Sequence, residues 1–156
     1  MEEQQESFLS EIEFTPVQAS MGKRFLNYLI DVIVFYVLVI ALGIIMAIIW
    51  PDFLSYNNST DIGTSILMRI VYMALFGLYM SAMEAIFKGR SVGKFITGTK
   101  AVYEDGSNIS LETAFQRGMS RVVPFEPFSA FGEPPYPWHD KWTNTYVIDL
   151  KASHVN

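Results

Sequence analysis

Three charged residues lie where a membrane segment would make a charge costly, and they are the first candidates for chemistry. Asp31 lies about two helical turns inside the first apolar segment, and Arg24 precedes it by seven residues, so both fall on one helical face. Glu84 lies near the end of the second apolar segment. An acid at the centre of a membrane helix costs about 2.5–3.5 kcal/mol and usually faces water or a partner. The pattern favours a structural ion pair between Arg24 and Asp31 that fixes helix register, and a polar cluster that handles cations or protons is the alternative.

The other residue types that catalyse reactions are absent or isolated. There are no cysteines, which excludes disulfides, thiolate catalysis and cysteine-based metal sites. The glycine-rich segment at residues 89–94 has one residue too few between its glycines for a phosphate-binding loop, and Phe95 stands where Ser or Thr would bind magnesium. His139 and His154 are isolated, so no metal site is expected. We therefore expect neither an enzyme nor a bound cofactor.

Two apolar segments are long enough to cross a bilayer as helices. The chain is 51% hydrophobic and only 17% charged, which is too apolar for a typical soluble domain. The first segment, residues 25–50, has 19 consecutive uncharged residues at 32–50, or about 28 Å of helix against about 30 Å of hydrocarbon. The second, residues 66–87, is uncharged from 70 to 83, with Arg69 and Glu84 on either side. We predict an all-α membrane protein with two transmembrane helices packed as a hairpin.

Basic residues flank the two segments on one side of the membrane only. The loop at residues 51–65 contains none. They stand before the first helix and after the second: Lys23, Arg24, Lys88, Arg90, Lys94 and Lys100. The positive-inside rule therefore places both termini in the cytoplasm. We expect a multi-pass protein of the cell (plasma or inner) membrane. The net charge of −5 gives no reason to expect a nucleic-acid partner. The two apolar segments make the lipid bilayer the expected partner.

Small residues recur at four-residue spacing on both apolar segments. The second carries Gly77, Ser81 and Ala85, and the first carries Gly43 and Ala47. Small side chains at that spacing allow helix backbones to approach closely. We expect these residues to pack the two spans against each other or against another copy.

The stretch after the second span predicts an amphipathic helix and a pair of strands. Ser110 is placed to cap a helix over 111–123, whose apolar stripe lies opposite Arg117 and Arg121. The helix is too short to span, so it lies in the cytoplasmic interface with its arginines toward lipid phosphates or protein acids, or it covers a small cytosolic subdomain. Residues 95–103 and 143–150 are strand-like and could form a small two-stranded cytoplasmic β element.

Three separated motifs resemble those of the RDD family, membrane proteins named for one arginine and two aspartates. The motifs are ASMGKRFLNYLIDVIV, GRSVGKFITGTKAV and WHDKWTNTYVI. Arg24 matches the family arginine, and Asp31 and Asp140 match the aspartates. The resemblance implies a polar tail at 1–17, an RDD-like membrane domain at 18–150 and a C-terminal tail at 151–156.

The resemblance also implies a role in transport, because some family members are linked to sodium/proton antiport. Many members carry a further hydrophobic segment before the last motif, where this chain has the amphipathic helix and a proline-rich stretch. Two helices enclose no path by themselves, so transport would require a homo-oligomer or another membrane protein. Arg24, Asp31, Glu84 and Asp140 would then form the ion or proton cluster. The alternative is a scaffold or accessory subunit that transports nothing.

Overall fold

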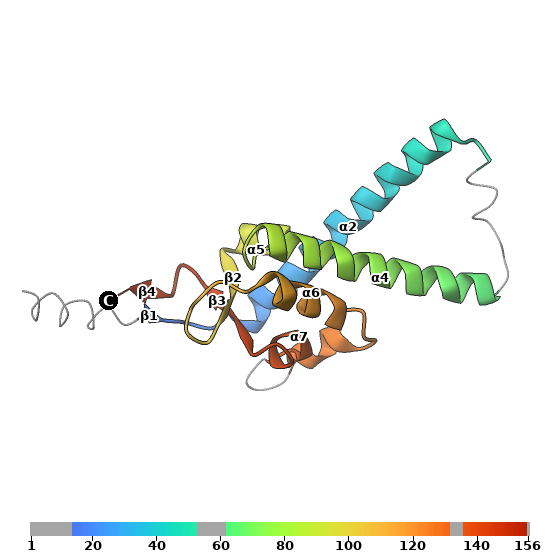
Figure 1. Cartoon of the computed structure of the whole chain (residues 1–156). Coiled ribbons are helices and arrows are strands. Elements are labelled where there is room, and N and C mark those ends of the chain that lie inside the picture. Colours follow the sequence, from blue (N-terminus) through green and yellow to red (C-terminus); the bar gives the residue numbers. More distant parts are fainter. Residues whose placement is uncertain (1–13, 53–61, 132–135, 156) are drawn as a thin grey trace, which may run out of the picture.

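The computed structural model describes residues 14–52, 62–131 and 136–155 (Figure 1). The predicted N-terminal tail up to residue 13 and most of the predicted external loop, residues 53–61, lie outside these ranges. The described chain is mostly helical, and α2 (Met21–Ile49) and α4 (Ile62–Ile86) are long and apolar enough to cross a membrane. The Ser20 hydroxyl caps α2 by accepting from the Lys23 amide. The helix ends before Trp50, which is extended because Pro51 follows it.

The two long helices cross near the N-terminal half of α2 and the C-terminal half of α4, and they diverge toward the end of α2 and the start of α4 (Figure 1). An aromatic cluster fills the crossing, where the Phe35 ring lies 5.3 Å from that of Phe76 and 5.8 Å from that of Tyr79. Beyond this point, within the described part of the chain, no atom of another segment lies within 4 Å of where a Cβ on Gly43 would stand. Gly43 therefore does not pack α2 against α4, and the prediction of a hairpin closed by small residues is wrong at this position of α2.

The small residues of α4 pack against a different helix, α6 (Leu111–Ser120). A Cβ on Gly118 would overlap the Ser81 hydroxyl and the backbone of Gly77. The Ser81 hydroxyl also donates to the Phe115 carbonyl at 3.2 Å. Phe115 lies beside Ser81 while Val122 lies beside Gly77, so α6 runs antiparallel to α4. The spacing of Gly77 and Ser81 thus correctly indicated close packing, but its partner is α6 rather than α2.

The faces of α6 are reversed relative to a helix lying on a membrane surface. Ser110 caps it as predicted, with the Thr113 amide donating to the Ser110 hydroxyl at 3.1 Å. Arg117 is completely buried, whereas Leu111 is 73% and Phe115 51% exposed. Of the two predicted environments for the α6 arginines, lipid phosphates or protein acids, the structure shows protein acids for Arg117.

Short strands and helices complete the end of the molecule that holds the start of α2 and the end of α4. Strand β2 (Thr99–Tyr103) pairs antiparallel with β3 (Thr145–Asp149), in the register Ala101 opposite Val147. The predicted strand at 95–103 is half wrong, because α5 (Val92–Thr97) occupies its start. Ser91 caps the beginning of α5, and Gly98 ends it at a φ of 70°, which glycine adopts readily. A second pair joins β1 (Phe14–Thr15) to β4 (His154–Val155).

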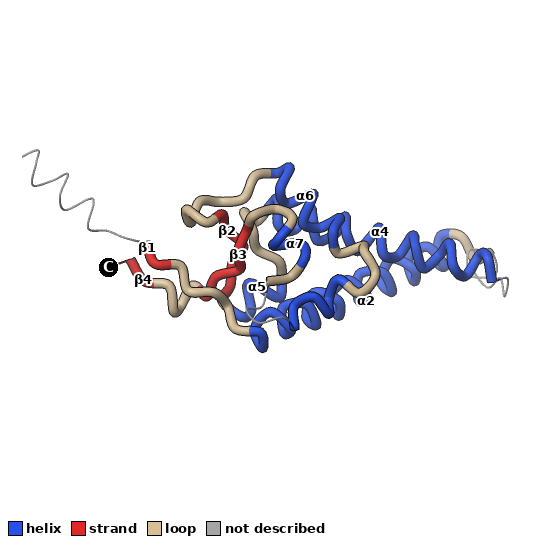
Figure 2. Tube along the Cα trace, turned by 90° about the horizontal axis from the view of Figure 1, so that it is seen from below, coloured by secondary structure: helices blue, strands red, loops and turns tan. Residues whose placement is uncertain are grey.

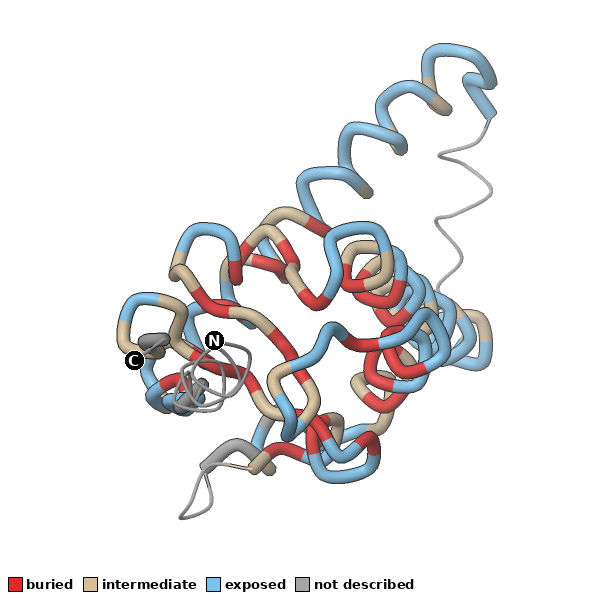
Figure 3. Tube along the Cα trace, turned by 60° about the vertical axis from the view of Figure 1, so that its left-hand side comes forward, coloured by how far each residue is buried: buried red, intermediate tan, exposed pale blue. Residues whose placement is uncertain are grey.

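Charged and polar side chains make up much of the buried interior. The apolar core is a small cluster of mostly short side chains: Ala19, Ala101, Ile109, Ala114 and Val147. Figure 2 shows the sheets at one end of the molecule and, at the other, the C-terminal half of α2 and the N-terminal half of α4. Buried residues concentrate between these two ends, and the C-terminal half of α2 is mostly exposed (Figure 3). The 3-10 helix η1 (Glu126–Phe131) and α7 (Trp138–Lys141) help enclose this interior.

Candidate functional site

Arg24 anchors the beginning of α2 to the C-terminal part of the chain. Its Nη1 donates to Asp140 Oδ2 on α7 at 2.5 Å. Its Nε and Nη2 donate to the carbonyls of Ala19 and Val147 at 3.1 and 3.3 Å. Both charged side chains are almost inaccessible, at 5% exposed for Arg24 and 0% for Asp140. The structure therefore brings together the arginine and the second aspartate that the sequence singled out.

Arg117 extends this pair into α4. Its Nη1 donates to Asp140 Oδ1 and its Nε to Glu84 Oε2, at 2.6 and 2.7 Å. Burial alone would lower the pKa of Arg117, but the adjacent carboxylates outweigh burial and hold the pKa above its usual value. The same argument applies in reverse to Asp140. Burial would raise its pKa, but Arg117, His139 and Arg24 hold it well below the usual range. Both groups of this pair are therefore charged at neutral pH.

Glu84 is the second acidic centre and contacts three cations. Its Oε1 accepts from Lys94 Nζ at 2.7 Å and from Arg121 Nη2 at 2.9 Å, in addition to the Arg117 contact on Oε2. Burial is the main reason that the pKa of Lys94 is lowered to about 8, and Glu84 opposes that shift. We call the six residues of this set the ion-pair network: Arg24, Glu84, Lys94, Arg117, Arg121 and Asp140.

Asp31 does not pair with Arg24, which corrects the expected ion pair between them. Asp31 accepts from the Ser91 hydroxyl at 2.5 Å and from the Gly93 amide at 2.8 Å, at the start of α5. The reason lies in helix geometry. Two turns separate the residues by about 10 Å, and helical side chains lean toward the N-terminus, so Arg24 leans away from Asp31. Asp31 has no ion-pair partner among the described residues, unlike Glu84 and Asp140.

The glycine-rich segment after α4 serves to hold α5 against α2. A Cβ on Gly93 would overlap the backbone of Asn27, so glycine is required for this approach. Asn27 is itself buried and contacts the hydroxyl groups of Thr97 and Thr99, the latter at 2.9 Å. The segment that superficially suggested a phosphate loop therefore positions Ser91 and Lys94 inside the protein.

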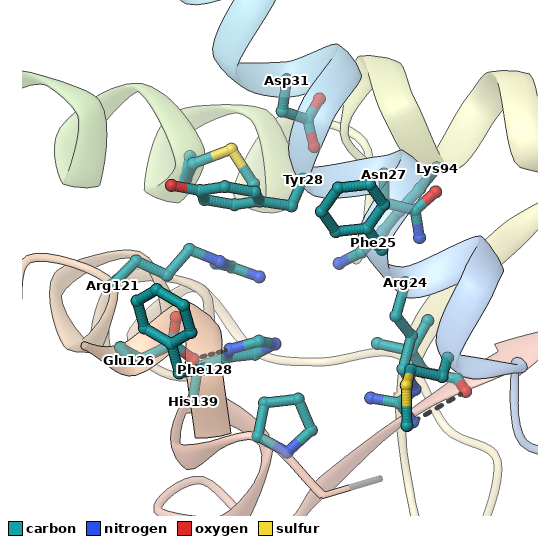
Figure 4. A pocket seen from close by; sticks show the side chains of 14 residues that line it. Arg24, Phe25, Asn27, Tyr28, Asp31, Lys94, Arg121, Glu126, Phe128 and His139 are labelled. Carbon is teal, nitrogen blue, oxygen red and sulfur yellow. Dashed lines mark hydrogen bonds and ion pairs between the residues drawn. The ribbon is translucent and has the colours of Figure 1, made fainter. Parts of the chain in front are cut away.

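A cavity of about 280 Å³ opens beside these groups (Figure 4). We call it the inner cavity. Its polar lining residues are Arg24, Asn27, Asp31, Lys94, Arg121, Glu126 and His139. Figure 4 shows the side chains of Arg121 and Lys94 pointing into the space between α2 and η1. His139 pairs with Glu126 through Nδ1, and burial lowers the pKa of His139 below its usual value. Within residues 14–52, 62–131 and 136–155, no set of three histidine or acidic side chains is arranged to hold a metal.

A family model decides the relationship of the chain to known proteins. The model of the RDD family matches residues 18–148, which is most of the chain. The protein belongs to the RDD family. No curated protein and no solved structure matches it significantly.

The three residues assigned to the RDD motif fall into two places in the structure. Arg24 and Asp140 join in the ion-pair network with Glu84, whereas Asp31 lies at the α5 terminus and lines the inner cavity. Four charged residues near them were not assigned to the cluster from sequence: Lys94, Arg117, Arg121 and Glu126. The arginines at four-residue spacing on the predicted amphipathic helix were the available signal, because a buried arginine requires an acid nearby.

Proposed function

We propose that this RDD protein is a multi-pass protein of the cell membrane, with α2 and α4 as its two spans and both termini in the cytoplasm. Three-quarters of the Ile48 side chain and 60% of Ile40 are exposed, which suits lipid and would be costly in water. Residues 32–49 of α2 cover about 27 Å, close to the hydrocarbon thickness. The ion-pair network then lies at the inner edge of the bilayer.

In this arrangement α6 and η1 enter the inner leaflet without crossing it. Helix α6 runs beside the Gly77–Ser81 part of α4, so it reaches the depth of the inner half of that span. Its outward-facing Leu111 and Phe115 would meet lipid, together with the 75%-exposed Phe125 beyond its end. The buried polar face satisfies the charges inside the protein, as a lipid environment requires.

The role that we propose is proton-coupled cation transport by an oligomer, and Asp31 carries the proposal. It is the one acid of the predicted cluster that faces a cavity while having only neutral hydrogen-bond donors among the described residues. Glu84 and Asp140 form ion pairs with arginines, so neither carboxylate can take up a proton without breaking the network. A carboxylate that exchanges a proton for a cation needs the less constrained environment of Asp31. Two spans enclose no path, so several copies or another membrane protein would complete one.

The test is ion flux in proteoliposomes with a pH gradient. Wild type should carry sodium or potassium in exchange for protons, and Asp31→Asn should insert and assemble but lose that flux. Asp105→Asn is the matched control, because Asp105 is an exposed turn residue bonded to Ser107. Flux of sodium, potassium and protons no greater than in empty liposomes for the wild-type oligomer would overturn the transport role.

The alternative is a scaffold or accessory subunit, and the ion-pair network favours it. Its six side chains tie α2, α4, α5, α6 and α7 together, which is what a rigid docking platform needs. A scaffold predicts no flux from wild type, with Asp31→Asn affecting only stability or assembly with the partner.

The orientation can be tested separately, because the chain has no native cysteine. Asn58→Cys lies in the predicted external loop, outside the described residues, and Lys151→Cys lies at an exposed position near the C-terminus. An impermeant thiol reagent added to intact cells should label position 58 and spare position 151. The reverse pattern would show that the topology is inverted.

A further inference from the structure

Two hollows in the structure lie back to back. The inner cavity has already been described, and a second space of about 510 Å³ lies between the diverging helices α2 and α4. We call the second space the groove. Tyr28, Arg121 and Phe128 line both, so these three residues form the boundary between them. Figure 4 shows Tyr28 and Arg121 on the same side of the inner cavity.

The two hollows differ in chemistry. The groove is walled mostly by apolar and aromatic residues, among them Val32, Phe35, Met73 and Phe76, and its two charged residues are Arg69 and Arg121. These apolar residues stand on the parts of α2 and α4 that the proposed topology places within the hydrocarbon. The inner cavity lies nearer the cytoplasmic ends and has more charged residues in its lining. A largely apolar, chain-sized groove that adjoins a chamber lined by charged residues at the membrane boundary matches the shape of an amphiphile.

The side chains around the inner cavity offer cationic donors to a negative group. Three cations line it, Arg24, Lys94 and Arg121, with two acids, Asp31 and Glu126. Each cation also pairs with Glu84 or Asp140, which do not line the cavity. Each acid has a donor of its own, from Ser91 and Gly93 for Asp31 and from His139 for Glu126.

The cations retain unused donors. Lys94 and Arg121 share one carboxylate oxygen of Glu84. Lys94 Nζ makes that single hydrogen bond among the described residues, which leaves two of its three N–H groups uncommitted. Arg121 uses Nη1 and Nη2 but has no bond from Nε within the described chain. A phosphate oxygen is the acceptor that such donors bind best.

We propose that the inner cavity and the groove together bind one anionic phospholipid of the inner leaflet. The phosphate lies against Lys94 and Arg121, and one acyl chain lies in the groove between α2 and α4. A headgroup without positive charge is selected, because the ammonium of a zwitterionic lipid would meet the three cations. This binding requires membrane insertion as in the proposed topology, but it does not require transport.

The experiment uses full-length protein in a neutral detergent and the probes phosphatidylglycerol, phosphatidylcholine and glycerol phosphate. Native mass spectrometry counts bound lipid, and thermal unfolding gives the apparent affinity from the concentration dependence of the Tm. One phosphatidylglycerol should bind at least tenfold more tightly than phosphatidylcholine, and glycerol phosphate should have no effect. Equal affinity for the two lipids, or an equal effect of glycerol phosphate, would overturn the proposal.

Two pairs of variants separate the chain from the headgroup. Val32→Trp fills the groove without replacing a charged residue, and it should weaken phosphatidylglycerol binding at least tenfold. Ile33→Trp is its control, because Ile33 is 54% exposed and lines neither hollow. Arg121→Gln should remove the preference for the anionic lipid, whereas Arg69→Gln, which removes a groove charge outside the inner cavity, should keep it.

If Val32→Trp does not elute as a folded protein, Met73→Trp fills the same groove from α4 and replaces it. Undiminished binding by a folded groove variant would refute the acyl-chain site. Flux without lipid selectivity would contradict this inference alone, and lipid selectivity without flux would contradict the transport role alone.

Discussion

Arg24 Nη1 and Asp140 Oδ2 lie 2.5 Å apart in the buried interior, although 116 positions separate the two residues in the chain. The pair joins the beginning of α2 to the last RDD motif. Asp140 also forms an ion pair with Arg117, and Arg117 forms one with Glu84. The two ends of the family domain are therefore connected through a continuous set of ion pairs.

Arg24 and Asp140 should be energetically coupled, whereas Arg24 and Asp31 should not. Breaking a buried ion pair leaves an uncompensated charge, which costs about 3–5 kcal/mol. Arg24→Gln and Asp140→Asn should each lower the free energy of unfolding, and the double variant should lose about 0.5–3 kcal/mol less than their sum. The cycle of Arg24→Gln with Asp31→Asn should be additive within about 0.5 kcal/mol, since the side chains are too far apart to interact. Denaturant unfolding in detergent measures both cycles, and coupling in the second one alone would refute the observed pairing.

Glu84→Gln should be among the most damaging single changes in the chain. It would leave Lys94, Arg117 and Arg121 without the carboxylate that they share, and all are nearly inaccessible. The expected loss is about 3–5 kcal/mol, seen as a sharp fall in folded protein recovered from membranes. Glu112→Gln is the control, because Glu112 is exposed on α6 and should change stability by less than about 0.5 kcal/mol. Similar yields for the two variants would argue against a buried network.

Gly118→Ala and Gly43→Ala should have opposite effects on stability. At Gly118 the new methyl group would overlap Ser81 and Gly77, forcing α6 away from α4 at a cost of about 1–3 kcal/mol. At Gly43 none of the other described segments comes within 4 Å of the added Cβ, so alanine should stabilise the helix by roughly 1 kcal/mol. Thermal unfolding of the two purified variants makes the comparison. Destabilisation by Gly43→Ala instead would indicate a contact at Gly43 with another copy or partner.

Stability should fall as the pH drops from about 6.5 to 5, and His139 should be the cause. Burial lowers the pKa of His139 in the folded protein, so below pH 6.5 the unfolded chain takes up a proton that the folded one does not. The slope is at most about 1.4 kcal/mol per pH unit. The acids Glu126 and Asp140 have lowered pKa values and contribute only at more acidic pH.

His139→Asn keeps a donor for Glu126 but removes the titration, so its Tm should be flatter than that of wild type between pH 6.5 and 5. The measurement is thermal unfolding at matched ionic strength. Parallel curves for the two proteins would assign the pH dependence to other groups.

Much of the architecture could be predicted from sequence because its determinants are local. An uncharged run at 32–50 indicates a span by its length alone, and Ser110 and Pro51 mark helix ends through contacts a few residues away. The strand character of 145–149 and the three family motifs are likewise carried by short stretches of chain. The one local error, a strand at the start of 95–103, arose because Ser91 and Gly98 supply both caps of a helix across β-branched residues.

The partner of each charge was decided by tertiary structure alone. Arg24 has Asp31 on its own helical face, yet it pairs with Asp140, because side-chain lean and the position of α7 favour the distant acid. The sequence marked Gly77 and Ser81 as a close-packing surface, but only the fold places Gly118 on it. An arginine on an amphipathic helix is compatible with lipid phosphate or with a protein acid. Arg117 turns inward because the carboxylates of Glu84 and Asp140, far from it in sequence, arrive together at one buried point.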